Sequence, residues 1–420
     1  MDRLVVTPCT EPLSGSVRVS GMTKNAGLKQ MAVSILGRGK STLTNMNKVA
    51  DLAIMCELLE SIGAKVIKED DNTFSIDSSG ELLPEAPYEL VSKMRASINV
   101  LSPLLATIGH AKVSLPGGDN IGIRKLDMHF RALEKMGVTI NVEEGFIHAS
   151  VDKLVGARIV LEFPSVGATE NILGAAVLAK GETVIENAAR EPEVKDLCNF
   201  LIKMGANIDG VGTSTLTING VDELKPTSHK IIGDRIEAGT FLMACAIVGG
   251  EITLEGISIS ELEMVVLKLG DMGMKVSPTK SGIWAKADVP LNCVDVSTLP
   301  FPGFSTDYMP FAVTLMSVSQ GTSIVTENIY DNRFAFTTEL IRMGADIRTE
   351  GRHCVIRGVD QLSGAQVSAG DVRAGAALCL AGLVANGETI IHDTMHVWRG
   401  YSDLPKSLSK LGANVKWESN

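Results

Sequence analysis

Two short patterns recur six times along this chain, and no other feature of the sequence restricts its fold as strongly. The first is a glycine that leads a β-like segment, as in GETVIEN, found at Gly39, Gly109, Gly181, Gly250, Gly321 and Gly387. The second is a helix end followed by a strand, as in KMGANI, with its glycine at Gly63, Gly137, Gly205, Gly273, Gly344 and Gly412. Successive copies are roughly 70 residues apart, which is typical of an internally repeated fold. We expect each second glycine to end a helix in the left-handed conformation, which a residue without Cβ adopts readily.

An apolar helix rich in small residues is predicted before each glycine-led strand, over residues 24–36, 95–108, 166–179, 235–248, 306–318 and 372–385. Because these helices are apolar on most faces, we expect them to be buried. Each repeat then consists of a strand, a buried helix, a strand, a more amphipathic helix and a strand. Three repeats can share one core, so six predict an α/β protein of two similar domains with an active-site cleft between them. A solenoid is the weaker alternative, because its repeats are normally about 20–50 residues long and simpler.

Length and composition agree with a folded chain of two or three domains, since 45% of the 420 residues are hydrophobic and 21% are charged. The net charge of −10 disfavours nucleic acid as a partner. No apolar run approaches the ~20 residues that cross a membrane, and the N-terminus has no apolar signal core. The seven cysteines form no CxxC pair, which predicts free thiols in a reducing compartment and hence a cytoplasmic protein.

Each predicted buried helix begins with a charged residue or with a residue suited to anions. These starting residues are Lys24 with Asn25, Arg95, Ser165 to Gly167, Asp234 with Arg235, Asp307, and Asp371 with Arg373. The N–H groups and the positive dipole end of a helix start favour phosphate or carboxylate ligands. If the six starts face one cleft, their four basic residues form a site for an anion: Lys24, Arg95, Arg235 and Arg373. For any single position the alternative is an ordinary cap or a solvated charge, but recurrence in register with the repeat favours a site.

Three further segments interrupt the repeat. Residues 116–124 (PGGDNIGIR) form a glycine-rich loop with one acid and one base, which suits a mobile lid. Residues 301–307 (FPGFSTD) place a carboxylate at a helix start, and residues 398–401 (WRGY) place an arginine between aromatic residues. The sequence has no GxGxxG after its first strand, no P-loop, no GxSxG and no HExxH, and its seven histidines lack metal-ligand spacing. No metal site is therefore predicted.

A set of longer motifs spans the chain from the first strand to the last repeat. Among them are SGMTKNA (20–26), MRASINVLSPLLA (94–106), PGGDNIGIRKLDMH (116–129), PSVGATENIL (164–173), GDRIEAGTF (233–241), FPGFSTD (301–307), TENIYDNRF (326–334), LSGAQVSAGDVRAGA (362–376) and WRGY (398–401). With these motifs the chain resembles the enolpyruvyl transferases, and within them the branch that acts on UDP-N-acetylglucosamine. The motif set of the sister branch, which makes 5-enolpyruvylshikimate 3-phosphate, is not found.

The resemblance implies a fold of two inverse α/β barrel domains, each of three βαβαβ-type repeats around buried helices, as in the enolpyruvyl transferase and RNA 3′-cyclase fold. It implies that residues 1–21 join residues 232–420 in one domain, which carries the phosphoenolpyruvate arginines and the base. Residues 22–231 then form an inserted domain with the lid loop and the acceptor site. The active site is expected in the cleft between the two.

The resemblance also assigns roles to individual residues. Phosphoenolpyruvate is expected to contact four cations, whose guanidinium groups suit phosphate and carboxylate: Lys24, Arg124, Arg373 and Arg399. Asn25 and Asp307 would approach the attacking sugar hydroxyl, with Asp307 as the base and Asp119 as the general acid. The nucleotide sugar would be lined by Arg95, Arg124, Lys125, Leu126, Asp127, His129, Ser165, Val166, Gly167 and Ile329. No metal or organic cofactor is implied, and the protein is expected to be a monomer or a weak homo-oligomer.

Four positions depart from the common pattern of the family. Asp119 stands where most members have a cysteine, which implies insensitivity to the epoxide fosfomycin. One extra residue precedes Lys24, Lys125 replaces a usual proline, and Trp398 replaces a usual acidic residue. These departures keep an alternative open, a paralogue that enolpyruvylates another uridine nucleotide such as UMP at its ribose 3′-hydroxyl in nucleoside-antibiotic synthesis. A non-catalytic sugar-nucleotide binder is disfavoured, because Asp307, Arg373 and Arg399 are all present.

Overall fold

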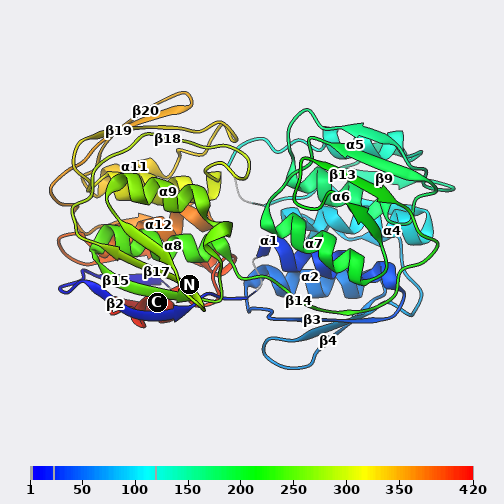
Figure 1. Cartoon of the computed structure of the whole chain (residues 1–420), viewed down its shortest axis with the longest axis horizontal. Helices are drawn as coiled ribbons and strands as arrows, with labels where there is room; N and C mark the ends of the chain where they lie inside the picture. Colours follow the sequence, from blue (N-terminus) through cyan, green and yellow to red (C-terminus); the bar gives the residue numbers. More distant parts are fainter. Residues whose placement is uncertain (1–2, 22–23, 119–120, 420) are drawn as a thin grey trace. The chain divides into compact units, whose positions relative to one another are not determined.

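The computed structural model describes residues 3–21, 24–118 and 121–419. The chain divides into two compact units (Figure 1). Among the described residues, the first unit comprises 3–20, 121–123 and 233–419, and the second comprises 21, 24–118 and 124–232. Within the described part of the chain, no helix combines the length and the apolar character needed to cross a membrane. All seven cysteines are free thiols, as predicted.

The second unit contains three four-stranded sheets, one for each repeat. Their strands are β3 (Lys40–Thr44), β4 (Lys65–Lys68), β5 (Phe74–Asp77) and β14 (Ser228–Lys230); β6 (Glu85–Ala86), β7 (His110–Ser114), β8 (Thr139–Glu143) and β9 (Phe146–Ser150); and β10 (Arg158–Val160), β11 (Glu182–Glu186), β12 (Asn207–Asp209) and β13 (Thr215–Asn219). Each sheet has one parallel pair, such as β10 with β11, and two antiparallel pairs. The strand β14 comes last in the unit and pairs in parallel with β3, so it completes the first repeat.

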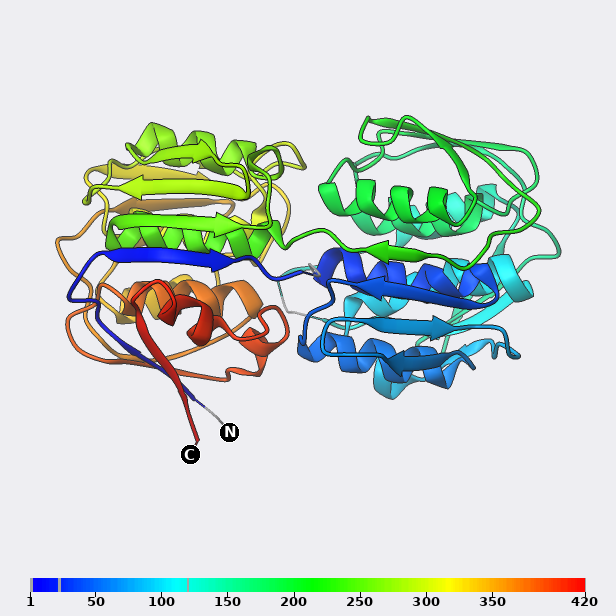
Figure 2. The same cartoon turned by 60° about the horizontal axis from the view of Figure 1, so that its bottom comes forward.

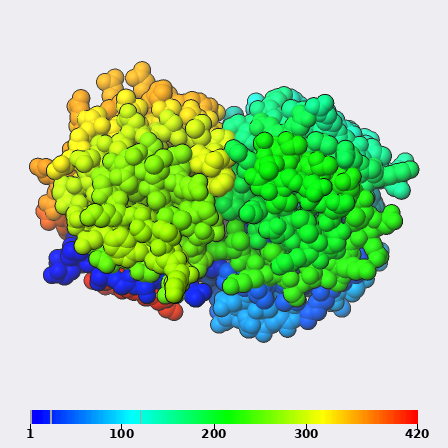
Figure 3. Space-filling view, in the orientation of Figure 1, coloured from blue at the N-terminus to red at the C-terminus, as the bar shows by residue number. Residues whose placement is uncertain are grey.

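The first unit repeats this plan. Its strands are β2 (Leu13–Arg18), β15 (Gly250–Glu255), β16 (Lys275–Pro278) and β17 (Gly282–Ala287); β18 (Val296–Ser297), β19 (Thr322–Thr326), β20 (Asp346–Glu350) and β21 (His353–Arg357); and β1 (Arg3–Thr7), β22 (Gln366–Ser368), β23 (Thr389–His392) and β24 (Asn414–Glu418). The N-terminal strands complete two of these sheets, because β2 pairs in parallel with β15 and β1 pairs antiparallel with β23 and β24. The strand β2 therefore lies beside the green strand β15, and β1 lies beside the red strand β24 (Figures 2 and 3).

The buried helices of the repeats form the centre of each unit. In the first unit they are α8 (Arg235–Val248), α10 (Met309–Met316) and α12 (Val372–Gly382), which pack on one another. In the second unit they are α1 (Lys24–Val33), α4 (Leu101–Ile108) and α6 (Val166–Ala176). The more exposed helices are α2 (Ala50–Ser61), α5 (Asp127–Lys135), α7 (Pro192–Lys203), α9 (Glu263–Met272), α11 (Thr337–Arg342), α13 (Met395–Trp398) and α14 (Leu404–Ser409), with the single turn α3 (Tyr88–Val91). The predicted fold class of two α/β units, each with three repeats around buried helices, is confirmed.

Two of the predicted buried helices begin as 3₁₀ turns. The segment predicted over 95–108 consists of η2 (Arg95–Val100) followed by α4, and the segment over 306–318 begins with η4 (Thr306–Tyr308) before α10. Pro103 and Pro310 lie in the first turns of the α-helical parts. A proline ring clashes with the carbonyl four residues earlier in an α-helix, so the preceding turn is wound more tightly. The remaining 3₁₀ turns are η1 (Ser34–Gly37) and η3 (Ile259–Glu261).

Candidate functional site

The helix starts of the second unit carry most of the predicted nucleotide-sugar residues. Ser165 is the N-cap of α6, and its Oγ accepts a hydrogen bond from the backbone N–H of Ala168 at 3.3 Å. Val166 and Gly167 follow as the first helical residues, so this start has the free N–H groups that an anion needs. At α1, the Nζ of Lys24 lies 2.8 Å from the Oδ2 of Asp51, a carboxylate with no solvent exposure on α2.

His129 lies against the start of α6. A Cβ added at Gly167 would be 3.1 Å from the Cε1 of His129, a tight contact, so the imidazole ring lies close against the backbone of the helix start. The amide of Asn171 on α6 lies 3.1 Å from the Nδ1 of His129. Burial, with a smaller contribution from the Arg95 charge, lowers the pKa of His129 to about 3. The ring is therefore neutral at pH 7, and it can donate or accept a hydrogen bond but carries no charge to a ligand.

Arg95 contacts residues 124 and 125, which were also predicted to bind the nucleotide sugar. Its Nη2 donates to the backbone carbonyls of Arg124 at 2.6 Å and of Lys125 at 3.2 Å. The guanidinium of Arg124 lies across Gly118, where an added Cβ would be 2.5 Å from Nη2 and 3.3 Å from the Cβ of Arg95. Leu126 is buried at the N-cap position of α5, and Asp127 opens that helix. The structure thus brings together these predicted residues of the second unit.

In the first unit, two arginines and two carboxylates form a compact charged group at the starts of α10 and α12. The Nη2 of Arg373 lies 3.5 Å from the Oδ2 of Asp307, and the Nη2 of Arg333 lies 3.5 Å from the Oδ1 of the same carboxylate. The Nη1 of Arg333 also lies 3.4 Å from the Oδ2 of Asp371, which caps α12. The predicted base therefore lies between two guanidinium groups.

The charges of this group are paired, but two of its buried N–H groups are not hydrogen-bonded within the described part of the chain. Arg333 Nε and Arg373 Nη1 are buried and have no hydrogen-bond partner in the described part of the chain. Burial acts to lower the pKa of Arg373, but Tyr401, Asp307 and Asp234 outweigh it and raise that pKa above its usual value. Arg373 is therefore a permanent cation. Buried N–H groups without partners are costly unless a ligand or water satisfies them, so these two donors suit a ligand that carries hydrogen-bond acceptors.

Arg333 was not among the residues predicted for the site, although it lies in the quoted motif TENIYDNRF. Glu327 in the same motif was also missed. Its buried carboxylate accepts hydrogen bonds from the Thr306 hydroxyl at 2.8 Å and from the Ile329 N–H at 2.7 Å. It therefore fixes the predicted base, one residue after Thr306, relative to Ile329. Motif position was the only available signal, because both residues act through contacts that require the folded chain.

The other predicted residues are placed as follows. Arg399 is half-buried and follows α13 as its C-cap, and Asn25 is half-buried beside Lys24 on α1. Arg235, which was predicted as part of the anion site, is buried with its guanidinium 5.7 Å from the ring centre of Phe301. Asp119, the predicted general acid, lies outside the described residues. Among the described residues, no group of three or more His, Cys, Asp or Glu side chains could hold a metal ion.

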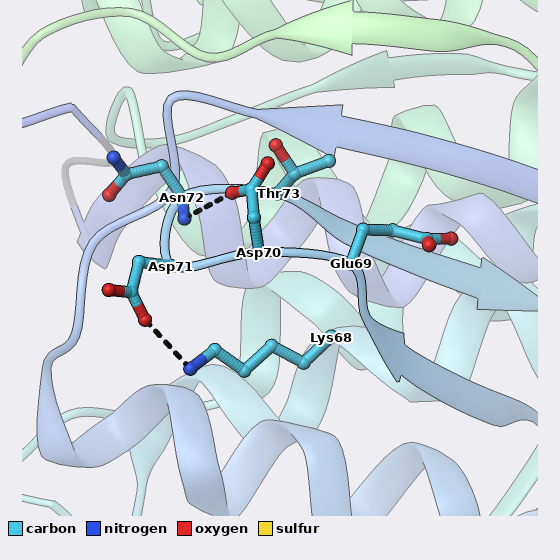
Figure 4. A pocket seen from close by; sticks show the side chains of 6 residues that line it. All are labelled: Lys68, Glu69, Asp70, Asp71, Asn72 and Thr73. Atoms are coloured by element: carbon cyan, nitrogen blue, oxygen red, sulfur yellow. Dashed lines mark hydrogen bonds and ion pairs between the residues drawn. The ribbon is translucent and has the colours of Figure 1, made fainter.

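A surface hollow lies apart from these groups, at the turn between β4 and β5 (Figure 4). It is lined by residues 68–73, none of which was predicted for the site. The carboxylate of Asp71 accepts from Lys48 at 2.8 Å and from Lys68 at 2.9 Å, and these contacts lower its pKa to about 2. Asp70 accepts from the Asn72 N–H at 2.7 Å. The hollow is an exposed turn whose charges already have partners.

Comparison with known proteins extends these observations to the whole chain. Residues 8–408 match the family model described as EPSP synthase (3-phosphoshikimate 1-carboxyvinyltransferase). The UDP-N-acetylglucosamine 1-carboxyvinyltransferase of Nitratidesulfovibrio vulgaris is 49% identical over 420 residues, covering 100% of both chains. The enzyme of the same name from Corynebacterium jeikeium is 48% identical over 415 residues, covering 99% of each chain. Among solved structures, the enolpyruvyl transferase NikO from Streptomyces tendae has a TM-score of 0.88 at 24% identity, covering 100% of this chain and 99% of its own.

The chain has six repeats in two units and an arginine–carboxylate group at the starts of two buried helices, and its relatives are named as transferases. The chain belongs to the EPSP synthase family of enolpyruvyl transferases. The resemblance read from the sequence motifs is therefore confirmed.

Proposed function

We propose that this protein transfers the enolpyruvyl group of phosphoenolpyruvate to the 3-hydroxyl of UDP-N-acetylglucosamine and releases phosphate. The observation that carries this function is identity of 48–49% over essentially the whole chain with transferases named for that acceptor. The NikO structure, at 24% identity, supports the fold alone. The alternative acceptor, UMP, thus has no observation of its own. The product would be a precursor of peptidoglycan, and the protein would act in the cytoplasm as a monomer or a weak homo-oligomer.

The proposed reaction has two steps. The sugar hydroxyl adds to C2 of phosphoenolpyruvate and loses its proton to Asp307, while C3 gains a proton from Asp119. The tetrahedral intermediate then returns a proton from C3 to Asp119, and the C2–O bond to phosphate breaks, which restores the double bond. The inorganic phosphate leaves with the proton that Asp307 had gained. The 3.5 Å contacts from Arg333 and Arg373 support Asp307 as the base, because they hold its carboxylate in one orientation for the arriving hydroxyl.

Four cations, two from each unit, are proposed to contact phosphoenolpyruvate. We assign phosphoenolpyruvate to Lys24, Arg124, Arg373 and Arg399. In the first unit, the unpartnered buried N–H of Arg373 supports this role, since it can donate to a substrate oxygen. In the second unit, the ion pair between Lys24 and Asp51 supports a lysine held at the start of α1. Loss of the Arg399 guanidinium by Arg399→Ala is expected to cost about 3 kcal/mol in catalysis, as for other preorganised electrostatic groups.

The nucleotide sugar is assigned to the second unit together with Ile329. The start of α6, Ser165 to Gly167, is suited to a diphosphate because its backbone N–H groups are at a helix N-terminus. The neutral imidazole of His129 lies beside it, and Arg95 orders Arg124 and Lys125. A ligand that carries two phosphates and a uridine offers partners to all of these groups.

The decisive experiment measures phosphate release from phosphoenolpyruvate with three acceptors in parallel: UDP-N-acetylglucosamine, UMP and shikimate 3-phosphate. We expect turnover with the first acceptor, and mass spectrometry should show its enolpyruvyl ether. An Asp307→Asn variant serves as the control, because it keeps the shape of the side chain but cannot take a proton. Turnover with UMP alone would establish the paralogue instead. Absence of phosphate release with every acceptor would reject the family reaction for this chain.

A further inference from the structure

We infer that a stacked pair of tryptophans, Trp398 and Trp417, positions Arg399 for phosphoenolpyruvate. The two indole rings lie 4.7 Å apart between centres and are inclined by only 15°. This is the geometry of an offset stack, which is worth more than the apolar area it buries. Trp398 is the last residue of α13 and directly precedes Arg399, whereas Trp417 lies near the end of the chain on β24. The inference rests on the proposed function, because it concerns the substrate contact of Arg399.

The short helix α13 requires such support. It has four residues, and an isolated helix of this length is unstable because its nucleation is not repaid by enough hydrogen bonds. Its orientation, and therefore that of the arginine at its end, must come from tertiary contacts. These contacts reach it from two sides.

The inner contacts place the segment against α12. A Cβ added at Gly375 would be 2.7 Å from the Cγ2 of Val397, and one added at Gly400 would be 2.2 Å from the Cγ1 of Val372. Two glycines therefore let α13 and α12 approach closely. The same Gly400 Cβ would be 3.3 Å from the Nη1 of Arg373, so the backbone next to Arg399 lies beside the other phosphoenolpyruvate arginine.

Tyr401 completes the inner side. It is buried, its hydroxyl is 2.8 Å from the Oγ1 of Thr240, and the Arg373 guanidinium lies 5.5 Å from its ring centre. The inner contacts thus come just before and just after Arg399, at Val397, Gly400 and Tyr401. They fix the distance of the segment from α12.

A further contact of the segment is the tryptophan stack. Trp417 pairs with Leu4 across β1 and β24, two strands whose hydrogen-bonded register spans five residue pairs (Figure 2). It is half-buried against the core of the first unit, and its Nε1 has no hydrogen-bond partner among the described residues. The ring is therefore held by packing and not by a polar contact of its own. Trp417 lies on a strand that is paired over five residues, whereas Trp398 lies on a four-residue helix. We therefore take Trp417 as the supporting residue and Trp398 as the residue that it positions.

The test compares Trp417→Leu and Trp417→Phe with the unchanged protein. Leucine keeps apolar volume but removes the stack, whereas phenylalanine keeps an aromatic face. We expect the KM for phosphoenolpyruvate to rise about three- to tenfold in Trp417→Leu, the range that an aromatic pair is worth. The KM for UDP-N-acetylglucosamine should stay within twofold, and Trp417→Phe should recover most of the loss. Trp284→Leu is the matched control, because Trp284 is the remaining tryptophan and lies on β17, where its Nε1 donates to Glu251 at 3.0 Å.

Two measurements separate the possible failures. Thermal unfolding of each variant shows whether the fold persists, and the exciton couplet of stacked indoles in circular dichroism should be present in Trp284→Leu and absent in Trp417→Leu. If the unchanged protein turns over UDP-N-acetylglucosamine and folded Trp417→Leu keeps its KM for phosphoenolpyruvate, the positioning role is wrong and the proposed function stands. If both KM values rise equally, the stack is merely structural. If the unchanged protein is inactive with every acceptor, the proposed function fails and this inference fails with it.

Discussion

Arg333 is the single residue whose contacts say most about the candidate site. With a side-chain exposure of 2%, it reaches Asp307 with one nitrogen of its guanidinium fork and Asp371 with the other. A planar fork can join two carboxylates, whereas an ammonium is a point charge. Arg333 therefore connects the proposed base to the residue that caps α12.

We expect Arg333→Lys to lower kcat by about 10²-fold, because lysine keeps the charge but cannot hold both carboxylates. The KM for the acceptor should change little. Steady-state kinetics with phosphate detection measures this, with Arg342→Lys as the control because Arg342 is an exposed arginine in an i,i+3 pair with Glu339. An Arg333→Lys enzyme with normal kcat would show that the two carboxylates need no common partner.

Asp119 gives the second prediction at this scale, through its chemistry alone. An ordinary aspartate titrates near pH 4, so a general acid of this type must keep its proton against that tendency. Asp119→Asn is expected to lose about 10²–10⁴-fold in kcat, because the amide cannot give up a proton. Asp119→Cys should keep activity, extend it to higher pH and become inactivated by fosfomycin, which needs a thiolate. Time-dependent inactivation of the unchanged protein by fosfomycin would contradict this role.

At the level of elements, the six glycine-terminated helices show how far the sequence could predict the fold. All six glycines at the predicted helix ends have positive φ, between 94° and 109°. The strand-leading glycines, for which no left-handed conformation was predicted, have positive φ at five positions, but in the first repeat Arg38 takes the left-handed conformation with φ of 46°. Gly39 is instead close to Pro226, where an added Cβ would be 2.9 Å from its Cγ. A local pattern cannot show such a contact, because Pro226 is distant in the sequence.

Two other features escaped prediction for the same reason. Each repeat carries an additional strand after the more exposed helix, as in β12 and β13, which join through a glycine-containing turn. The predicted repeat has only one strand after the more exposed helix, whereas the structure has two. Some of these strands are short. The contacts of Arg333 and Glu327 join segments more than 20 residues apart. The residues that carry a motif could thus be found from sequence, whereas the partners that orient them required the fold.

The start of α8 supplies a prediction on pH and stability. The fully buried carboxylate of Glu237 accepts from the Ser20 N–H at 2.6 Å and from its hydroxyl at 3.0 Å. Burial, followed by the charge of Asp234, raises the pKa of Glu237 to about 7, from a usual 4.5. The folded state therefore binds this proton more tightly than the unfolded state. Its contribution to stability is complete below pH 4.5 and is lost as the pH rises to about 7.

The stability that Glu237 contributes falls by on the order of 3 kcal/mol between pH 4.5 and about 7. We expect Glu237→Gln to remove this component, because the amide is neutral at every pH and can still bond to both groups of Ser20. Urea unfolding at a series of pH values measures the effect as a flatter profile between pH 4.5 and 7. Glu263→Gln is the matched control, since Glu263 is an exposed residue in the first turn of α9. If the unfolding free energies of Glu237→Gln and Glu263→Gln changed in parallel with pH, the Glu237 pKa would lie near its ordinary value.

At the scale of the whole molecule, the chain builds two hydrophobic cores that share no residue. The core of the first unit gathers residues of α8, α10 and α12 with strands from both ends of the chain, including Leu4. The core of the second gathers residues of α1, α4 and α6, including Leu173. Because β1 and β2 complete sheets with strands from the C-terminal half, the first unit can close only after the whole chain is made. The repeat count alone does not reveal this dependence, since six copies divide equally well into consecutive halves.

Separate cores predict separate responses to core damage. Phe311 on α10 and Leu173 on α6 have no solvent exposure, so Phe311→Ala and Leu173→Ala should cost about 3–5 and 2–5 kcal/mol respectively, through lost burial and the cavity left behind. Native-state hydrogen exchange followed by mass spectrometry can assign each loss to a unit. We expect Phe311→Ala to reduce protection mainly in α8 and α12, and Leu173→Ala mainly in α4 and α5, which pack on α6, since protection reports the local unfolding free energy. Each variant serves as the control for the other. An equal loss of protection in both units would mean that they unfold as one cooperative body in spite of their separate cores.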